Sequence, residues 1–180
     1  MLGVVFTEFL DFVAAGHGEE ALERVIEEAA LDHGGAYTAI GLYDADELRR
    51  LAAALAACTG READALLLEF GTRLGAALIE RYPQVFAGHA DLFDLLCGLG
   101  GHIRDVLHML DPQADAPVFR GEVVSPARMR LDYRSSAPLP PLAQGLVLAA
   151  AAHYGTPVSI VAGPAPDARA DVVRFDIRRR

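Results

Sequence analysis

The sequence predicts an α+β fold in which a bundle of helices precedes a β-β-α-β-β unit with an antiparallel sheet. Helical spacing of apolar residues dominates the chain up to Leu110, and strand-like alternation of apolar and charged residues begins after it. An Ala/Leu-rich helix then separates two pairs of strands. We expect one domain over residues 1–180, with a helical part over about residues 1–60 and a sheet-bearing part over about residues 61–180.

The first two helices are predicted by apolar spacing and by the glycines that follow them. Residues 3–14 are apolar on much of the helix surface, and Gly16 and Gly18 are expected to end this helix. Residues 19–31 have the spacing of an acidic amphipathic helix, with the alanine, leucine, valine and isoleucine side chains turned inward.

The next three helices have clear end signals. Asp44 and Glu47 resemble a capping box, with Asp44 as the N-cap of a helix over residues 45–58. A Thr-Gly pair closes that helix, and a second long helix over residues 61–81 ends before a proline. A further helix over residues 90–110 stops at an Asp-Pro pair.

The remaining chain predicts four strands and one helix. Strands are expected over residues 118–124, 127–134, 157–162 and 171–178, with a helix over residues 141–154 behind a proline-rich turn. Alternation is clearest in the second strand, which predicts one buried and one solvated side. The apolar side comprises Met129, Leu131 and Tyr133, and the charged side comprises Arg128, Arg130, Asp132 and Arg134.

Composition excludes several classes of function. A net charge of −9 argues against nucleic acid binding, and 52% hydrophobic residues support a sizeable core. Two cysteines without a CxxC pattern argue against a disulfide framework or a zinc site and indicate a reducing cytoplasm. We expect no signal peptide, since Glu8 and Asp11 interrupt the first apolar run. We expect no membrane span, since no stretch approaches the roughly 20 uncharged apolar residues that one needs. The acid-rich residues 1–32 form either a solvated surface or a docking face for a partner protein.

One histidine in the helix over residues 90–110 is the strongest candidate for a functional residue. His102 follows three glycines and lies on an apolar stripe at helical spacing. An imidazole there must find a partner or lose solvation, so a hydrogen-bonded core histidine is one interpretation. Because the glycines remove side chains near it, a ligand to a large planar cofactor is the other. The stripe comprises Leu92, Leu95, Leu99, His102 and Val106, and the glycines are Gly98, Gly100 and Gly101.

Further motifs surround this histidine. The run Tyr82-Pro-Gln-Val-Phe-Ala-Gly88 precedes His102 by fourteen residues, and Tyr133-x-Ser135 lies on a predicted strand. Together with Met1-x-Gly3 and Gly145-Leu-Val, these motifs resemble the haem-nitric oxide/oxygen binding (H-NOX) family, which includes the haem domain of soluble guanylate cyclase. The resemblance covers nearly the whole chain, and the family's helices-then-sheet order agrees with the predicted fold.

The resemblance implies a set of residues that contact haem b. His102 matches the proximal axial ligand of the iron, and Pro117 matches a proline that packs on the haem and bends it. Tyr133 and Ser135 match the first two members of the Tyr-x-Ser-x-Arg motif that holds the haem propionates. Ala137 stands where the family has the arginine, and losing such a contact would weaken haem binding roughly ten- to a hundredfold.

The resemblance also implies which residues face the gas ligand. Val5, Phe9, Leu74 and Leu142 match the distal side, and Leu142 occupies the position of the tyrosine that oxygen-binding members use. Bound O₂ needs a hydrogen-bond donor, whereas NO and CO need it much less. A wholly apolar distal side therefore predicts binding of NO and CO with O₂ excluded.

The sequence thus predicts a stand-alone haem-based NO sensor that is not an enzyme. It has no catalytic motif of its own, and the resemblance implies a separate histidine kinase or cyclic-dinucleotide enzyme as signalling partner. A haem-free relative is the alternative: it would bind an apolar molecule or sense metal or redox state through Cys97 and His108. A peroxidase-like enzyme is a third interpretation, disfavoured by the lack of a polar distal acid or base.

Overall fold

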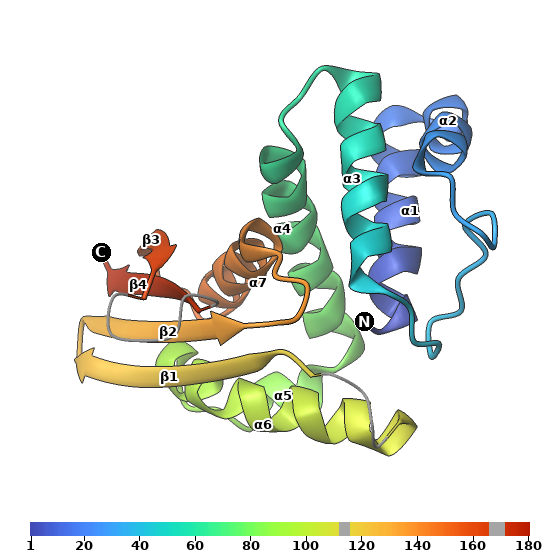
Figure 1. Cartoon of the computed structure of the whole chain (residues 1–180). Helices are drawn as coiled ribbons and strands as arrows, with labels where there is room; N and C mark the ends of the chain where they lie inside the picture. The colour runs from blue at the N-terminus through green and yellow to red at the C-terminus, as the bar shows by residue number, and fades with distance from the viewer. Residues whose placement is uncertain (112–115, 166–171) are drawn as a thin grey trace.

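The computed structural model describes residues 1–111, 116–165 and 172–180 of the chain. The helices are α1 (Gly3–His17), α2 (Glu19–Ala29), α3 (Ala45–Thr59), α4 (Ala63–Arg81), α5 (Pro83–Ala87), α6 (Leu92–Leu110) and α7 (Pro140–His153). The strands are β1 (Val118–Ser125), β2 (Arg128–Arg134), β3 (Val158–Pro164) and β4 (Val173–Arg179). Figure 1 shows α1, α2 and α3 together at one end, the sheet at the other, and α4 and α7 between them. The predicted α+β order is confirmed.

The sheet is antiparallel throughout, with strand order β1-β2-β4-β3. In the central strand β2, Met129, Leu131 and Tyr133 are buried, as the alternation predicts. Tyr133 pairs with Phe119 on one side and with Val173 on the other. The inner face of the sheet therefore carries an apolar column that ends at Tyr133.

The core consists of two apolar clusters. The helical cluster joins α1, α2, α3 and α4 to the start of α7, and its largest fully buried side chains include Phe6, Phe9 and Phe70. The sheet cluster joins the first half of α6 and the inner face of the sheet to α7. Leu142 belongs to the helical cluster and its neighbour Ala143 to the sheet cluster, so the start of α7 lies where the two clusters meet.

Three local predictions need correction. α1 continues through Gly16 and ends at Gly18, whose φ of 87° suits glycine alone. The short helix α5 was not predicted because five residues are too few to show a helical period. The capping box is not formed: Asp44 accepts a hydrogen bond from the Asp46 N–H at 2.9 Å, while Glu47 turns away.

Glu47 instead binds two side chains of the segment between α2 and α3. Its Oε2 accepts a hydrogen bond from the Tyr37 hydroxyl at 2.7 Å and lies 2.8 Å from Nε2 of His33. Burial, followed by the Glu47 hydrogen bond, raises the pKa of Tyr37 well above its ordinary value. Tyr37 stacks on Phe6 of α1 with ring centroids 4.4 Å apart. Glu47 therefore ties the segment to α1 rather than capping its own helix.

No helix in the described ranges is both long and apolar enough to cross a membrane.

Candidate functional site

The first half of α6, the helix that carries His102, is anchored at its start. Asp91 caps it by accepting hydrogen bonds from the N–H groups of Phe93 at 2.9 Å and Asp94 at 3.0 Å. Leu92 is fully buried in the sheet cluster. These contacts fix the direction in which the rest of the helix leaves the sheet.

The second half of α6 runs beyond the sheet, as Figure 1 shows. Leu99 is half-buried, His102 is exposed, and Met109 is 86% exposed. The side chain of Val106, the last member of the predicted stripe, lies outside the described part of the chain. The expectation that His102 is buried is therefore wrong, although Leu107 further along the same helix is buried. α6 contacts the first residues of β1 and then continues past them.

His102 forms no hydrogen bond or ion pair with any residue that the structure describes. The interpretation as a hydrogen-bonded core histidine requires burial and a partner, and neither is present among those residues. What the fold presents instead is an exposed imidazole that continues an apolar stripe, available to an external group.

The three glycines before His102 have different surroundings. A Cβ on Gly100 would lie 2.5 Å from the carbonyl oxygen of Phe119, and one on Gly98 would lie 2.9 Å from the His89 ring. A Cβ on Gly101 would meet nothing within 4 Å. Gly98 and Gly100 therefore allow close packing inside the protein. The sequence interpretation expected open space beside all three glycines, and of these Gly101 alone has it.

The contact at Gly100 places Pro117, Tyr133 and Ser135 close to α6. Phe119 pairs with Tyr133 across the two strands, and their rings stack with centroids 5.0 Å apart. Continuing the register by one pair beyond Val118 and Arg134 would set Pro117 opposite Ser135. Four of the predicted site residues thus gather at the end of the sheet that α6 passes.

Tyr133 also connects this end of the sheet to the helical cluster. Its hydroxyl oxygen accepts a hydrogen bond from the Leu139 N–H at 3.1 Å, and Leu139 is a buried member of that cluster. The hydroxyl proton of Tyr133 has no acceptor among the described residues. A buried hydroxyl in this state is a donor that can serve a carboxylate.

The predicted distal residues share the cluster to which Leu139 belongs. Phe9 is 0%, Leu74 1% and Leu142 6% exposed, and all three belong to the helical cluster with Val5 packed against it. The set is wholly apolar. The fold therefore brings the predicted distal residues together and links them to Tyr133 through Leu139 and the start of α7.

The segment after Tyr133 is held by Ser135. Its Oγ accepts a hydrogen bond from the Ala137 N–H at 3.3 Å, and both residues are half-buried. Arg134 is exposed and belongs to the opposite face of the strand, so it does not replace the arginine of the family motif.

A metal or redox site at Cys97 and His108 finds no support. Eleven residues along a continuous helix separate the two by about 16 Å. The Cys97 residue is exposed, yet desolvation of its sulfur, reinforced by Asp94 and Asp91, raises the pKa of the thiol. Within the described ranges no group of three or more His, Cys, Asp or Glu side chains could hold a metal ion.

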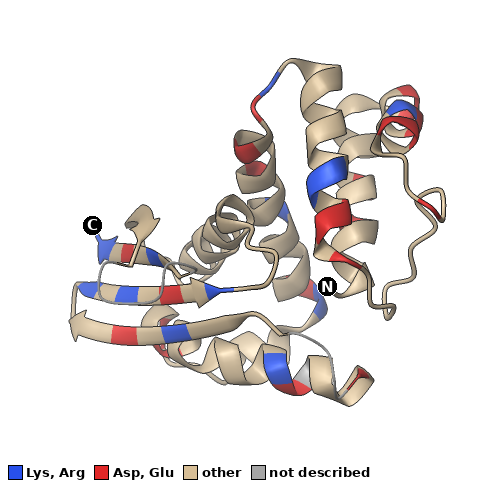
Figure 2. Ribbon diagram, in the orientation of Figure 1, with Lys and Arg blue, Asp and Glu red and all other residues tan. Residues whose placement is uncertain are grey.

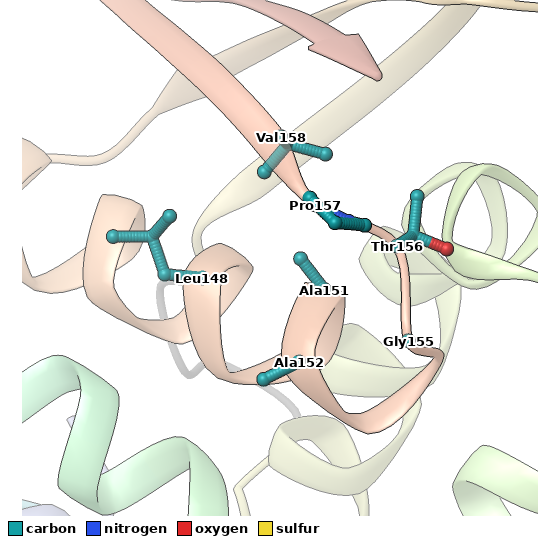
Figure 3. Close-up of a pocket in the computed structure, with 7 residues that line it drawn as sticks. All are labelled: Leu148, Ala151, Ala152, Gly155, Thr156, Pro157 and Val158. Atoms are coloured by element: carbon teal, nitrogen blue, oxygen red, sulfur yellow. The ribbon is translucent and has the colours of Figure 1, made fainter. Parts of the chain in front are cut away.

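A separate shallow hollow of about 310 Å³ lies where α7 ends and β3 begins (Figure 3). Its lining is apolar apart from Thr156, whose hydroxyl donates to the carbonyl oxygen of Tyr154 at 3.2 Å. It includes none of the predicted site residues and no titratable group. This hollow offers no chemistry beyond shape.

Comparison with known proteins decides the family. A sequence model described as haem-NO-binding matches residues 2–162. The chain belongs to the haem-NO-binding, or H-NOX, family. H-NOX domains are haem-binding gas-sensor domains, and the resemblance stated from the motifs is confirmed. No match to a curated protein was found.

Solved H-NOX structures have the same fold as this chain. The Fe(II) unliganded H-NOX protein from K. algicida is 28% identical, with a TM-score of 0.89 over 100% of this chain and 97% of that one. An H-NOX protein from S. oneidensis in the Fe(II)NO ligation state is 23% identical, with a TM-score of 0.87 over 100% and 99%. A mutant of the T. tengcongensis H-NOX protein has a TM-score of 0.86 at 17% identity, covering 100% and 98%.

The residues of this H-NOX chain fit a haem group. The imidazole of His102 has no partner among the described residues, and Tyr133 and Ser135 supply hydroxyl groups. The apolar helical cluster adjoins Tyr133 through Leu139. Sequence reasoning missed Phe119 and Leu139, which position Tyr133 by stacking and by hydrogen bonding. The sequence could have predicted the role of Phe119, because a tight hairpin between the two predicted strands pairs Phe119 with Tyr133.

Proposed function

We propose that this chain is a haem-based sensor of nitric oxide that also takes CO, excludes O₂, and signals to a separate protein. The observation that supports it most is the exposed imidazole of His102, unpaired among the described residues, on an apolar stripe next to the contact of Gly100 with Phe119. A core histidine would be buried and paired, and a surface histidine would not continue the apolar stripe of its helix.

His102 would hold the iron of haem b through an imidazole nitrogen, and the bound haem would supply a centre for a diatomic gas. Release of His102 on binding of NO would be the signal. The Tyr133 hydroxyl and the Ser135 hydroxyl would donate hydrogen bonds to the propionates. Pro117, set opposite Ser135 by the strand register, would pack on the flat face of the group.

Ligand selection would depend on the distal wall. Val5, Phe9, Leu74 and Leu142 carry no hydrogen-bond donor in their side chains. A bound O₂ would therefore have no group there to stabilise its partial negative charge, whereas NO and CO would lose little. The apolar wall would also exclude water from the gas-binding side.

Signalling would follow from a change in what holds α6. If the bond from His102 weakens, the second half of the helix loses a restraint, and Gly101 lets the backbone bend at little cost. A separately encoded histidine kinase or cyclic-dinucleotide enzyme in the cytoplasm would read that change. In this proposal residues 61–180 form the haem-binding part and residues 1–60 a helical part that covers its distal side.

The absorption spectrum of the purified full chain with haem supplied tests the proposal. We expect a strong Soret band that shifts when NO or CO is added to the ferrous protein. His102→Gly should lose this spectrum and free imidazole should restore it, because imidazole replaces the missing ligand. His108→Gly, on the exposed end of the same helix, should leave it unchanged. A Soret band that is insensitive to His102→Gly would contradict the assignment.

A haem-free H-NOX-like binding module is the second candidate, and Ala137 favours it, since the motif arginine is missing there. In that case haem titration would give no saturable Soret band, while the chain would keep its fold. Peroxide turnover by the haem-loaded protein would instead favour the enzyme interpretation.

A further inference from the structure

The sheet has one face that no helix of the described chain covers. α6 and α7 pack on the inner face, which carries Met129, Leu131 and Tyr133. The opposite face, here called the outer sheet face, is formed by the alternate residues of each strand. It comprises Val118, Arg120, Glu122 and, after a bulge, Ser125 of β1, Arg128, Arg130, Asp132 and Arg134 of β2, Ser159 and Val161 of β3, and Arg174, Asp176 and Arg178 of β4.

The outer sheet face is basic although the chain is acidic. Six arginines and three carboxylates give it an excess of three positive charges, whereas the whole chain has a net charge of −9. Figure 2 shows these charged residues along β1, β2 and β4, and the acidic residues of α2 at the far end of the molecule. The charge of the chain is therefore strongly polarised between its two ends.

The arginines on this face are held in place by carboxylates. Arg174 binds Asp132 through Nε at 2.6 Å and Nη2 at 2.9 Å. Arg128 and Arg178 share Asp176, each with Nε 3.1 Å from Oδ1. These pairs fix guanidinium groups across neighbouring strands, and Arg128 and Arg178 use only part of their five donors on the described residues. Such pre-organised donors lose little side-chain entropy when a further anion binds.

Not every arginine of the face is paired in this way. Arg120 is exposed and forms no ion pair with a described residue. It stands directly across from Asp132, whose carboxylate is occupied by Arg174. Arg120 therefore offers a full guanidinium to a group outside the chain.

Apolar side chains flank the arginines at both edges of the sheet. Val118 is 43% exposed on β1, and Val161 is 70% exposed on β3. Exposed valines beside ordered arginines combine apolar surface with the guanidinium groups that are enriched in protein interfaces. A sheet of four strands of seven or eight residues presents roughly 450 Å² of flat area, about half of one partner's share of a standard interface. That size suits a transient contact.

We propose that the outer sheet face docks a partner protein through a segment in which carboxylates alternate with apolar side chains. The carboxylates would bind the arginines of β2 and β4 together with Arg120, and the apolar side chains would cover the valines at the edges. The existence of a separate signalling partner rests on the function proposed above, but the chemistry of this face does not.

The same strands connect this face to α6. Phe119 and Gly121, which alternate with Arg120 on β1, contact α6 at Gly100 and Cys97 respectively. A displacement of α6 therefore moves the strand that carries Arg120. The affinity of this face for a partner would therefore change when a change at His102 displaces α6.

The probe for a test is a synthetic octapeptide of alternating glutamate and valine, titrated into isotope-labelled full-length protein with and without haem. We expect amide chemical-shift changes on β2 and β4, and binding that weakens severalfold between about 50 and 300 mM salt. Arg120→Glu should weaken binding at least roughly tenfold, as expected for loss of a charged contact plus repulsion. Arg24→Glu, the same charge change on the exposed side of α2, should leave binding unchanged.

Other outcomes would overturn the proposal. These are no binding, shifts confined to α6 or α2, or equal weakening by both variants. Tight binding to vesicles of anionic lipid that Arg120→Glu abolishes would assign the face to a membrane. A dimer in sedimentation that Arg120→Glu dissociates would assign it to a second copy of the chain. Peptide binding is measured with and without haem. Failure of the docking proposal would appear as no peptide binding in either form, whereas failure of the proposed function would appear as no Soret band.

Discussion

Gly100 of α6 lies against the backbone carbonyl of Phe119 in β1, so closely that a Cβ on the glycine would be 2.5 Å from the carbonyl oxygen. Backbone atoms cannot turn aside as a flexible side chain can. The spacing between the helix that carries His102 and the strand that positions Tyr133 is therefore set by the absence of one methyl group. Four residues of the proposed haem site depend on this spacing.

Gly100→Ala is expected to destabilise the protein by up to about 2 kcal/mol. Alanine would stabilise an unhindered helix by about 1 kcal/mol, but overpacking against a fixed backbone costs about 1–3 kcal/mol. Urea unfolding followed by circular dichroism measures the difference. The matched control is Gly101→Ala, where a Cβ meets nothing within 4 Å and only the helix-propensity gain remains. If both variants change stability alike, the close contact does not govern α6.

Asp91 gives α6 a pH-dependent start. Hydrogen bonds from the backbone N–H of Asp94, then the Arg179 guanidinium at 2.8 Å, lower the pKa of Asp91 below its ordinary value of 3.8. The unfolded chain then binds more protons at acid pH, so this stabilisation is complete above about pH 5 and is lost as pH falls through the folded pKa.

Two substitutions separate the cap of α6 from its charge. At neutral pH, Asp91→Ala should cost about 1 kcal/mol through loss of the cap, while Asp91→Asn should cost less because its amide oxygen still accepts. The gap between wild type and Asp91→Asn should close as pH falls from about 6 to 3, measured by urea unfolding at each pH. A gap that is independent of pH would show that the Asp91 charge contributes nothing.

Periodicity made the elements of the fold predictable, and strand alternation made the inner face of the sheet predictable. Met129, Leu131 and Tyr133 are buried because a strand places alternate residues on one face, which a single sequence reveals. The short helix α5 has too few residues to show a period. Glu47 had the spacing of a capping box, but the hydroxyl of Tyr37 offered a better partner.

The surroundings of His102 could not be read from its own helix. Whether an apolar stripe is buried depends on where the neighbouring strand begins, and that is a tertiary relationship between α6 and β1. For the same reason the three glycines looked alike in sequence, although Gly98 and Gly100 pack against other residues and Gly101 does not. The spacing of the motifs identified the family because chains that share a fold keep the residues of α6 and β1 at similar distances along the sequence.

Ala137→Arg should strengthen haem binding roughly ten- to a hundredfold if the proposed propionate site is correct. Ala137 is half-buried and its N–H binds Ser135 Oγ at 3.3 Å, so a guanidinium there starts from the segment that holds the hydroxyl donors. A charge-assisted contact to a carboxylate contributes about 1.5–3 kcal/mol. The rate of haem transfer to an excess of apomyoglobin measures the change. Ala137→Gln, which adds length and a donor without charge, should give a smaller effect.

Leu142→Tyr should allow the ferrous haem-loaded protein to form a stable complex with O₂. Leu142 is 6% exposed in the apolar cluster that also contains Phe9 and Leu74, so the new hydroxyl would be the first side-chain donor in the proposed distal wall. The larger ring should cost about 1–3 kcal/mol of stability. Leu142→Phe is the control, since it adds the same ring without a donor and should lower stability alike while leaving O₂ excluded. Absorption spectra of the ferrous proteins in air distinguish the two, and an oxy spectrum in wild type or in Leu142→Phe would refute selection by a distal donor.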